Sequence, residues 1–284
     1  MSNIWIKKSM RAFKVGSQYV LYGLIVFMMI YPLWWLLSSM LKTSQEIMAI
    51  PPTFFPSYIT FENLGVVFQR IDILGKMMIN SFYVSITIPI FQTIIALFAG
   101  YAFARIKFKG RNLIFILFIG SMMIPPQLTM ITNYITIANG LKLMNNLLSL
   151  QLLGMFSAFS IFMFRQRFLT IPQELEEAAK IDGCGTFGTF FRIALPLAKP
   201  VIYINLILSF NAIWGDFFVP MMFLRKKEVM TLPIGLTIIQ GAYNTQSIGV
   251  MVAAIGMTTI PSILVYLIFR KQLVLGITST GLKL

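Results

Sequence analysis

Residues 17–40 read "SQYVLYGLIVFMMIYPLWWLLSSM", a run without a single charged side chain. A helix needs about 20 mostly apolar residues to cross the hydrocarbon core of a bilayer, and this run is long enough. It follows a basic N-terminus, as a signal peptide would, but it is too long for the apolar region of a signal peptide and no small-residue cleavage site follows it. We therefore expect residues 17–40 to form a first membrane-spanning helix that is retained.

Further apolar stretches of the same kind occur along the rest of the chain. They lie at roughly 77–103, 112–131, 146–169, 199–224 and 247–270. Of the 284 residues, 57% are hydrophobic and only 11% are charged, whereas soluble domains carry about 25% charged residues. No low-complexity linker divides the chain. The sequence predicts an all-α integral membrane protein with six transmembrane helices in a single domain over residues 1–284.

The distribution of lysine and arginine predicts the orientation of these helices. Of the 23 basic residues, 16 lie before the first span, between spans two and three, between spans four and five, or after span six. Basic residues accumulate in cytoplasmic loops, so we expect both termini in the cytoplasm. The remaining loops hold Lys42, Arg70, Lys76, Lys142, Arg225, Lys226 and Lys227. The last three of these form a basic cluster in a loop that we expect outside the cell, which is contrary to the usual distribution.

The composition argues against nucleic-acid binding and against catalysis. The formal net charge is +14, but the charges flank apolar runs instead of forming a continuous patch. The chain has no histidine and a single cysteine, Cys184. We therefore expect no metal site, and the chain lacks the side chain that most often acts as a general base. It contains no GxxxxGK[ST] phosphate-binding loop. Asp216 is the only acid within a predicted span, which disfavours an intramembrane enzyme.

One short segment is rich in acids, in contrast to the rest of the chain. Residues 174–182 read "ELEEAAKID" and hold four of the nine carboxylates, namely Glu174, Glu176, Glu177 and Asp182. High helix propensity predicts a helix here, with Thr170 as its cap and Gly183 as its stop. A second short helix should follow and end at Pro196. From the residues alone, this loop of about 170–198 is either a docking surface for another protein or a helix whose acids only keep it soluble.

A resemblance decides between these two readings. "EAAKIDG", then nine residues, then "IALP" is similar to the loop signature of ABC-importer permeases. The motif positions are occupied by Glu177, Ala178, Ala179, Gly183, Ile193, Leu195 and Pro196. "YPLWWLLSSMLKT", "YAFARIKFKGRN", "MMIPPQ" and "FFRIALPLAKP" resemble the carbohydrate-importer branch. The tail "GITSTGLKL" resembles the second permease subunit of maltose-type importers, although it ends in Leu284 where glycine is usual, and Gly215 stands where the branch commonly has asparagine.

The resemblance implies a type I ABC importer permease fold in a bacterial plasma membrane. It implies that the loop between helices 4 and 5 is a cytoplasmic coupling helix, in which Glu177 meets a basic residue of an ATPase subunit and Asp182 and Gly183 shape the helix end. The implied partners are a second homologous permease, two ATPase subunits and an extracellular or lipid-anchored solute-binding protein. ATP and magnesium would bind to the ATPase subunits, and this chain would bind no cofactor of its own.

Polar side chains within the spans are candidates for a substrate path. A polar group in a bilayer usually faces a cavity or another helix, and sugars are bound by polar groups and flat aromatic rings. The candidates are Asn80, Gln92, Asn205, Asn211 and Trp214. For Trp214 the alternative is a residue of the interfacial aromatic belt, and for Asn211 it is a hydrogen bond between helices.

Two alternatives to a carbohydrate importer remain at this point. The first is an importer of the same superfamily for another polar solute, such as a glycerophosphodiester or a peptide. The second, from a different class, is a passive channel, which would explain the six spans but not the coupling motif.

Overall fold

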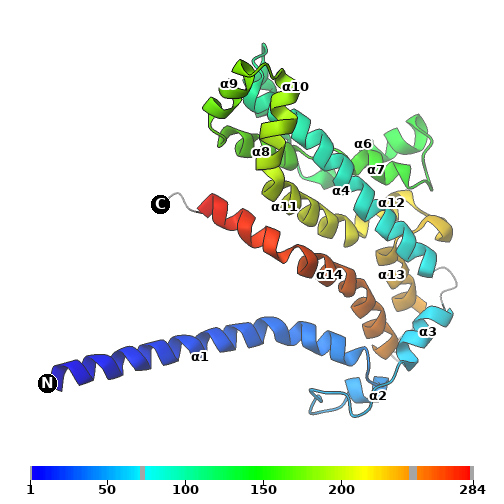
Figure 1. The fold of residues 1–284 in the computed structure, drawn as a ribbon. Coiled ribbons are helices and arrows are strands. Elements are labelled where there is room, and N and C mark those ends of the chain that lie inside the picture. Colours follow the sequence, from blue (N-terminus) through cyan, green and yellow to red (C-terminus); the bar gives the residue numbers. More distant parts are fainter. Residues whose placement is uncertain (1, 71–73, 243–247, 282–284) are drawn as a thin grey trace. The chain divides into compact units, whose positions relative to one another are not determined.

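The computed structural model describes residues 2–70, 74–242 and 248–281, and within these ranges the chain forms helices and no strand (Figure 1). The helices are α1 (Ser2–Ser39), α2 (Ser44–Ile47), α3 (Glu62–Arg70), α4 (Leu74–Arg105), α5 (Arg111–Ser121), α6 (Pro126–Ile135), α7 (Leu148–Gly154), α8 (Ala158–Leu169), α9 (Gln173–Ile181), α10 (Thr186–Thr189), α11 (Leu195–Trp214), α12 (Phe218–Phe223), α13 (Leu232–Ala242) and α14 (Ile248–Gly281). Two π-helical turns, η1 (Thr136–Gly140) and η2 (Phe190–Ala194), and one 3-10 turn, η3 (Lys227–Val229), complete the set.

The all-α fold class is confirmed, and the helices are long and apolar enough for a membrane. In the described ranges, four stretches qualify as spans: Lys14–Ser39, Leu74–Arg105, Thr186–Trp214 and Ile248–Gln272. Two further pairs of helices qualify if each bent pair is counted as one span. The structure thus carries four to six candidate spans, which agrees with the six that the sequence predicts.

The chain forms two compact units, one of residues 1–71 and 239–257 and the other of residues 72–238 and 258–284. The single domain over residues 1–284 therefore stays a prediction, and each unit is described by itself. The end of the tail, residues 282–284, lies outside the described residues.

In the first unit, a loop after α1 folds back on that helix. Trp34 Nε1 and Ser38 Oγ both donate to the carbonyl of Phe54, each at 3.1 Å. Glu46 Oε1 accepts hydrogen bonds from the hydroxyl of Thr53 and from the backbone and hydroxyl of Ser57, at 2.8–2.9 Å. Burial alone would raise the pKa of Glu46, but these hydrogen bonds and the nearby Lys42 lower the pKa below its ordinary value. The carboxylate therefore closes the loop in its ionised form.

The core of the second unit lies where α4, α8 and α11 meet. Small residues allow the close approach: Ala96 and Ala104 on α4, and Ala198 on α11, are buried there. A Cβ atom at Gly100 of α4 would lie only 2.7 Å from Cβ of Phe164 on α8. Helices inside a membrane gain little from hydrophobic burial against each other, so close packing of small residues stabilises such contacts.

Two of the predicted spans are bent helix pairs. The stretch predicted at 112–131 consists of α5 and α6, which meet at 98°. Pro125 and Pro126 cause the break, because a residue before proline is driven away from helical backbone angles, and Pro126 then fits the first turn of α6. The stretch predicted at 146–169 consists of α7 and α8, bent by 44°.

The predicted fifth span, 199–224, does not have the same ends as the helix in the structure. The helix does not run to residue 224, because α11 ends at Trp214 and α12 begins only at Phe218. Asp216 separates the two helices, since its Oδ1 accepts hydrogen bonds from the backbone N–H groups of Phe218 and Val219 at 3.0 and 3.2 Å. The carboxylate thereby satisfies N–H groups that open α12 and have no partner within the helix.

Candidate coupling site

The acidic stretch forms the helix α9, which lies with α10 at the end of the second unit where α4 finishes (Figure 1). The start of the helix differs from the sequence prediction. Thr170 does not cap α9, because it follows α8 and its hydroxyl donates to the carbonyl of Arg167. Pro172 holds the N-cap position instead, without a side-chain hydrogen bond.

The predicted stop at Gly183 agrees with the backbone. Gly183 has a φ of +84°, which side chains with a Cβ rarely adopt. The N–H of Gly183 donates to the carbonyl of Lys180, and the N–H of Cys184 donates to that of Ala179, at 3.0 and 2.9 Å. These two bonds satisfy carbonyls at the end of the helix, in the pattern typical of a glycine stop.

The carboxylates of α9 divide between two sides of the helix. Glu174, Glu177 and Asp182 are exposed, whereas Glu176 is buried. Its Oε1 lies 2.9 Å from Nε of Arg105, the last residue of α4, and both side chains are only 7% exposed. Sequence reasoning missed this pair. Nothing in the sequence marks Glu176 as different from its neighbours, apart from the helical rotation of about 100° per residue that separates it from Glu177.

The second half of the loop continues into the next span instead of ending at Pro196. The helix α10, the turn η2 and α11 follow one another without a break from Thr186 to Trp214. Pro196 lies in the first turn of α11, directly after the π-helical turn. A wider π turn removes the strict need for the hydrogen bond that proline lacks, so the helix can pass through.

An aromatic cluster fixes this second half against α4 and α8. The ring of Phe190 in η2 lies 5.1 Å from that of Phe98 and 5.0 Å from that of Tyr101, both on α4. Tyr101 also meets Phe168 of α8 edge to face at 5.4 Å. Such contacts contribute roughly 0.5–1.5 kcal/mol each beyond burial.

The residues of the loop signature are thus placed on a partly exposed element. Glu177, Ala178, Asp182, Gly183 and Pro196 are exposed, Ile193 and Leu195 are partly buried, and Ala179 is buried. Exposed residues are available to a partner, whereas Ala179 serves the contact of α9 with its own chain. The coupling role of these residues stays a prediction.

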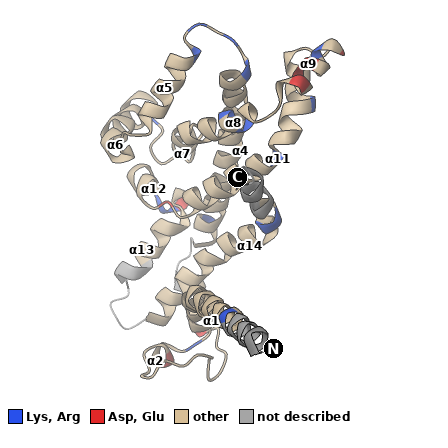
Figure 2. Cartoon of the chain, turned by 90° about the vertical axis from the view of Figure 1, so that its left-hand side faces the viewer, with Lys and Arg blue, Asp and Glu red and all other residues tan. Residues whose placement is uncertain are grey.

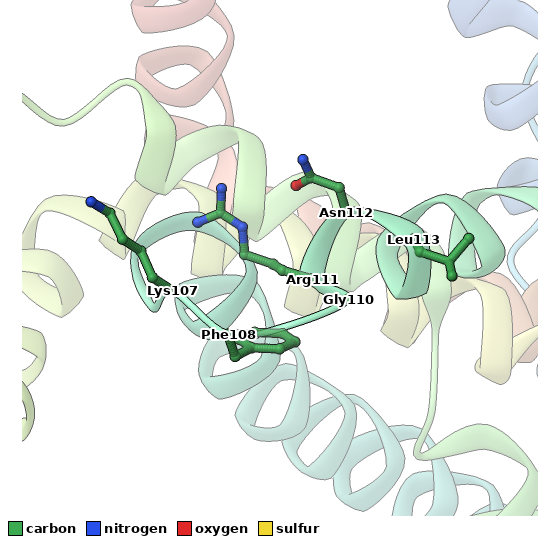
Figure 3. A pocket seen from close by; sticks show the side chains of 6 residues that line it. All are labelled: Lys107, Phe108, Gly110, Arg111, Asn112 and Leu113. Carbon is green, nitrogen blue, oxygen red and sulfur yellow. The ribbon is translucent and has the colours of Figure 1, made fainter.

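Basic side chains gather at the same end of the unit. The colouring of the backbone in Figure 2 marks lysine and arginine positions along the loop that joins α4 to α5. Lys107, Arg111 and Asn112 extend to the same side of this loop (Figure 3) and line an open hollow of about 300 Å³. Other arginines near this end are partly exposed and contact their own chain: the guanidinium of Arg165 lies 4.0 Å from the ring centre of Phe115, and Arg167 donates twice to the carbonyl of Leu197.

Two of the candidate path residues line one cavity. Gln92 of α4 and Asn205 of α11 face a space of about 250 Å³, together with Ser157, Ser160 and Ser209. Asn205 is 2% exposed, and its amide accepts from Ser160 Oγ and donates to Thr93 Oγ1, each at 2.8 Å. Gln92 donates to the carbonyl of Gly154 and accepts from Ser209. Sequence reasoning missed these hydroxyl partners, although small polar residues within a span are the signal for such a network.

The other three candidates lie apart from this cavity. Asn80 is buried and donates to the carbonyls of Glu228 and Met230 at 3.0 and 2.9 Å, so it ties α4 to η3 and the residue after it. Trp214 is also buried, and its Nε1 donates to the carbonyl of Thr258 at 2.7 Å. A belt residue would expose its indole, so that alternative does not describe Trp214. Asn211 is exposed and donates to the carbonyl of Ile207 on its own helix.

Permease proteins of named transport systems are similar to this chain over nearly its whole length. It is 32% identical to the arabinooligosaccharides transport system permease protein AraQ of Halalkalibacterium halodurans, over 92% of this chain and 94% of that protein. It is 28% identical to the galactooligosaccharides transport system permease protein GanQ of Bacillus subtilis, over 97% of this chain and 98% of that protein.

A solved structure and a family model match the chain as well. A subunit of a bacterial ABC transporter involved in the import of the acidic polysaccharide alginate superposes with a TM-score of 0.79, at 22% identity, over 92% of this chain and 96% of that one. The sequence model of the family described as binding-protein-dependent transport system inner membrane component matches residues 92–278. The chain therefore belongs to the family of inner-membrane permeases of binding-protein-dependent transport systems.

Proposed function

We propose that this chain is one transmembrane permease subunit of an ATP-driven ABC importer that takes up a sugar or oligosaccharide. An extracellular binding protein delivers the substrate, as the family description implies. The carbohydrate class is supported by relatives that are named for the transport of arabino- and galactooligosaccharides and that align with almost the entire chain.

The exposed side of α9 offers a docking surface, and it supports the proposal that other subunits supply ATP hydrolysis. Glu177 has no ion pair within the part of the chain that the structure describes, and it lies on a short helix presented to the solvent. An unpaired carboxylate at the exposed surface is suited to a basic residue of a partner. We infer that an ATPase subunit docks here, and that ATP and magnesium bind to that subunit.

The complete importer then consists of this chain, a second homologous permease, two ATPase subunits and the binding protein. The two permeases would surround the substrate path, and docking at α9 would transmit the closure of the ATPase subunits to the helices. The family description supports a location in the bacterial plasma membrane, and the excess of basic residues in four of the predicted loops and ends supports an orientation with both termini in the cytoplasm.

Purification of the intact complex in mild detergent tests this function. We expect the chain to copurify with ATPase subunits, and ATP hydrolysis to rise when the binding protein is added with the correct sugar. A chain that purifies without any ATPase, and that lets a polar solute equilibrate without ATP, would support the passive channel instead. Stimulation by a peptide or a glycerophosphodiester, and not by a sugar, would correct the substrate class alone.

A further inference from the structure

We propose that the Arg105–Glu176 ion pair is the link that makes α9 and α4 move as one body, so that Glu176 positions the coupling helix while Glu177 contacts the ATPase subunit. This inference rests on the proposed function and assigns a separate role to the second glutamate of "EE". Glu176 is a positioning residue in this proposal, since it touches neither substrate nor ATP.

Apart from this ion pair, little holds α9 against α4. The helix extends only from Gln173 to Ile181, and such short helices are not stable alone in water. The buried residues of α9 are Glu176 and Ala179. The methyl group of Ala179 is therefore the only side chain of a hydrophobic residue on the buried face of this helix. Its position against the rest of the unit therefore depends on the carboxylate of Glu176.

The guanidinium of Arg105 is held by two different groups. Its Nε faces Oε1 of Glu176 at 2.9 Å, and its Nη2 donates to the carbonyl of Ile171, two residues before α9 begins. Tyr101, one turn earlier on α4, is buried and interacts with both charges. The planar guanidinium thus holds the entry to α9 and its first turn at the same time.

The helix α4 leads from this ion pair to the cavity that two candidate path residues line. Arg105 ends α4, and Gln92 on the same helix lines the cavity that it shares with Asn205. The two positions are about 20 Å apart along the helix axis, at 1.5 Å per residue. A displacement of α9 that is transmitted through the ion pair would reach the polar cavity through one continuous helix.

The two roles predict different failures. Loss of the Glu177 contact should weaken the association with the ATPase subunits. Loss of the Arg105–Glu176 pair should weaken the association less than loss of Glu177 does, because the exposed residues of α9 are unchanged, but it should separate ATP hydrolysis from the movement of α4.

The experiment uses the complete importer in proteoliposomes, with three readouts: copurification of the ATPase subunits, stimulation of ATP hydrolysis by sugar-loaded binding protein, and sugar taken up per ATP hydrolysed. E176Q should retain the ATPase subunits and lose about tenfold or more of the uptake per ATP, because a buried charge loses its partner. E174Q is the matched control, since Glu174 is an exposed glutamate of the same helix, and it should behave as wild type.

Restoration by exchanged charges makes the test specific. R105E combined with E176R should recover part of the uptake per ATP that either single variant loses, since the charges pair again but the hydrogen bond to the carbonyl of Ile171 is not restored. If E176Q does not accumulate in the membrane, two other variants replace it in the test. These are E176D, which keeps the charge, and the exchanged pair. Both should assemble and couple better than R105E alone.

Two results would overturn the inference. One is an uptake per ATP in E176Q equal to that of E174Q, and the other is an E176D variant, with the charge kept, that couples no better than R105E. A wild-type complex without sugar-stimulated ATP hydrolysis would instead contradict the proposed function, so the two failures are distinguishable.

Discussion

Glu176 and Glu177 are neighbours in sequence but have opposite environments: Glu176 is buried against Arg105 at 2.9 Å, whereas Glu177 is exposed. A rotation of about 100° per residue separates two adjacent side chains of a helix. One short helix can therefore bind its own chain with one carboxylate and a partner with the next. The acidic stretch that is unusual for so basic a protein thus provides one buried contact within the chain and one exposed carboxylate.

The exposed glutamate gives the first prediction. The substitution E177K should leave the protein in the membrane but reverse a charge at the proposed contact with the ATPase subunit. A hydrogen bond to a charged group is typically worth about 1.5–3 kcal/mol, so the association should weaken roughly 10- to 150-fold. Titration of the ATPase subunits onto the purified permease measures this, with E174K as the control. Equal affinities for E177K and wild type would exclude Glu177 from the contact.

The helix stop gives the second prediction. Gly183 has a φ of +84°, and a residue with a Cβ is strained there by roughly 1–2 kcal/mol. G183A should loosen the end of α9 and increase the rate at which a protease cuts the loop. Gly185 has a φ of −70° and open space around it, so G185A is a matched control that should cut at the wild-type rate. Identical rates for G183A and G185A would show that the turn does not need glycine.

These two sites show what the sequence could predict. Helix propensity and the spacing of "EAAKIDG" predict α9 and its glycine stop, because both depend on residues within a few positions of each other. The burial of Glu176 could not be predicted in the same way, since it depends on Arg105, which lies far away in sequence. The continuation through Pro196 was also missed, because the π-helical turn before it is not visible in residue propensities.

The membrane helices show the same division. Apolar stretches predict where the spans lie, but not that Pro125 and Pro126 separate two helices at 98°. The polar residues within the spans are visible in the sequence, yet their partners are set by packing. Asn205 reaches Thr93 and Ser160 on two other helices, and only the fold brings these together.

The helix contact at Gly100 gives the third prediction. A Cβ there would lie 2.7 Å from Cβ of Phe164 and 2.9 Å from the backbone nitrogen of Arg165. G100A should therefore force α4 and α8 apart, at a cost of about 1–3 kcal/mol, and lower the melting temperature in detergent. Gly75 lies on the same helix with nothing within 4 Å, so G75A should not lower it. A melting temperature unchanged by G100A would contradict this packing.

The buried amide network gives the fourth prediction. Both ends of the Asn205 amide bond to side chains of its own chain. N205L should therefore act on stability, with a loss of about 1–2 kcal/mol in the membrane setting. Melting temperature should fall while the KM for sugar, measured on the folded fraction, stays at the wild-type value. A raised KM with unchanged stability would instead place Asn205 in contact with the substrate.

The loop after α1 gives a prediction for pH. Hydrogen bonds from Ser57 and Thr53 outweigh the effect of burial and lower the pKa of Glu46 below 4.5. A group with a lowered pKa in the folded state stabilises at pH values above its unfolded pKa, and the effect is lost as the pH falls through the folded pKa. Proteolysis of this loop by an acid-tolerant protease should therefore accelerate as the pH drops below 4.5.

The variant E46Q checks the origin of this acid dependence. Its loop should already be cut faster at neutral pH and should show a smaller further increase in acid. An equal increase in wild type and E46Q would assign the acid dependence to other groups.

Uptake into proteoliposomes shows whether this permease uses ATP to move sugar in one direction. The importer is reconstituted with ATP inside, and labelled oligosaccharide is added outside with the binding protein. We expect the sugar to accumulate above the external concentration, in a process that requires ATP and the binding protein and is lost in E177K. Equilibration to the external concentration, at the same rate with and without ATP, would contradict it.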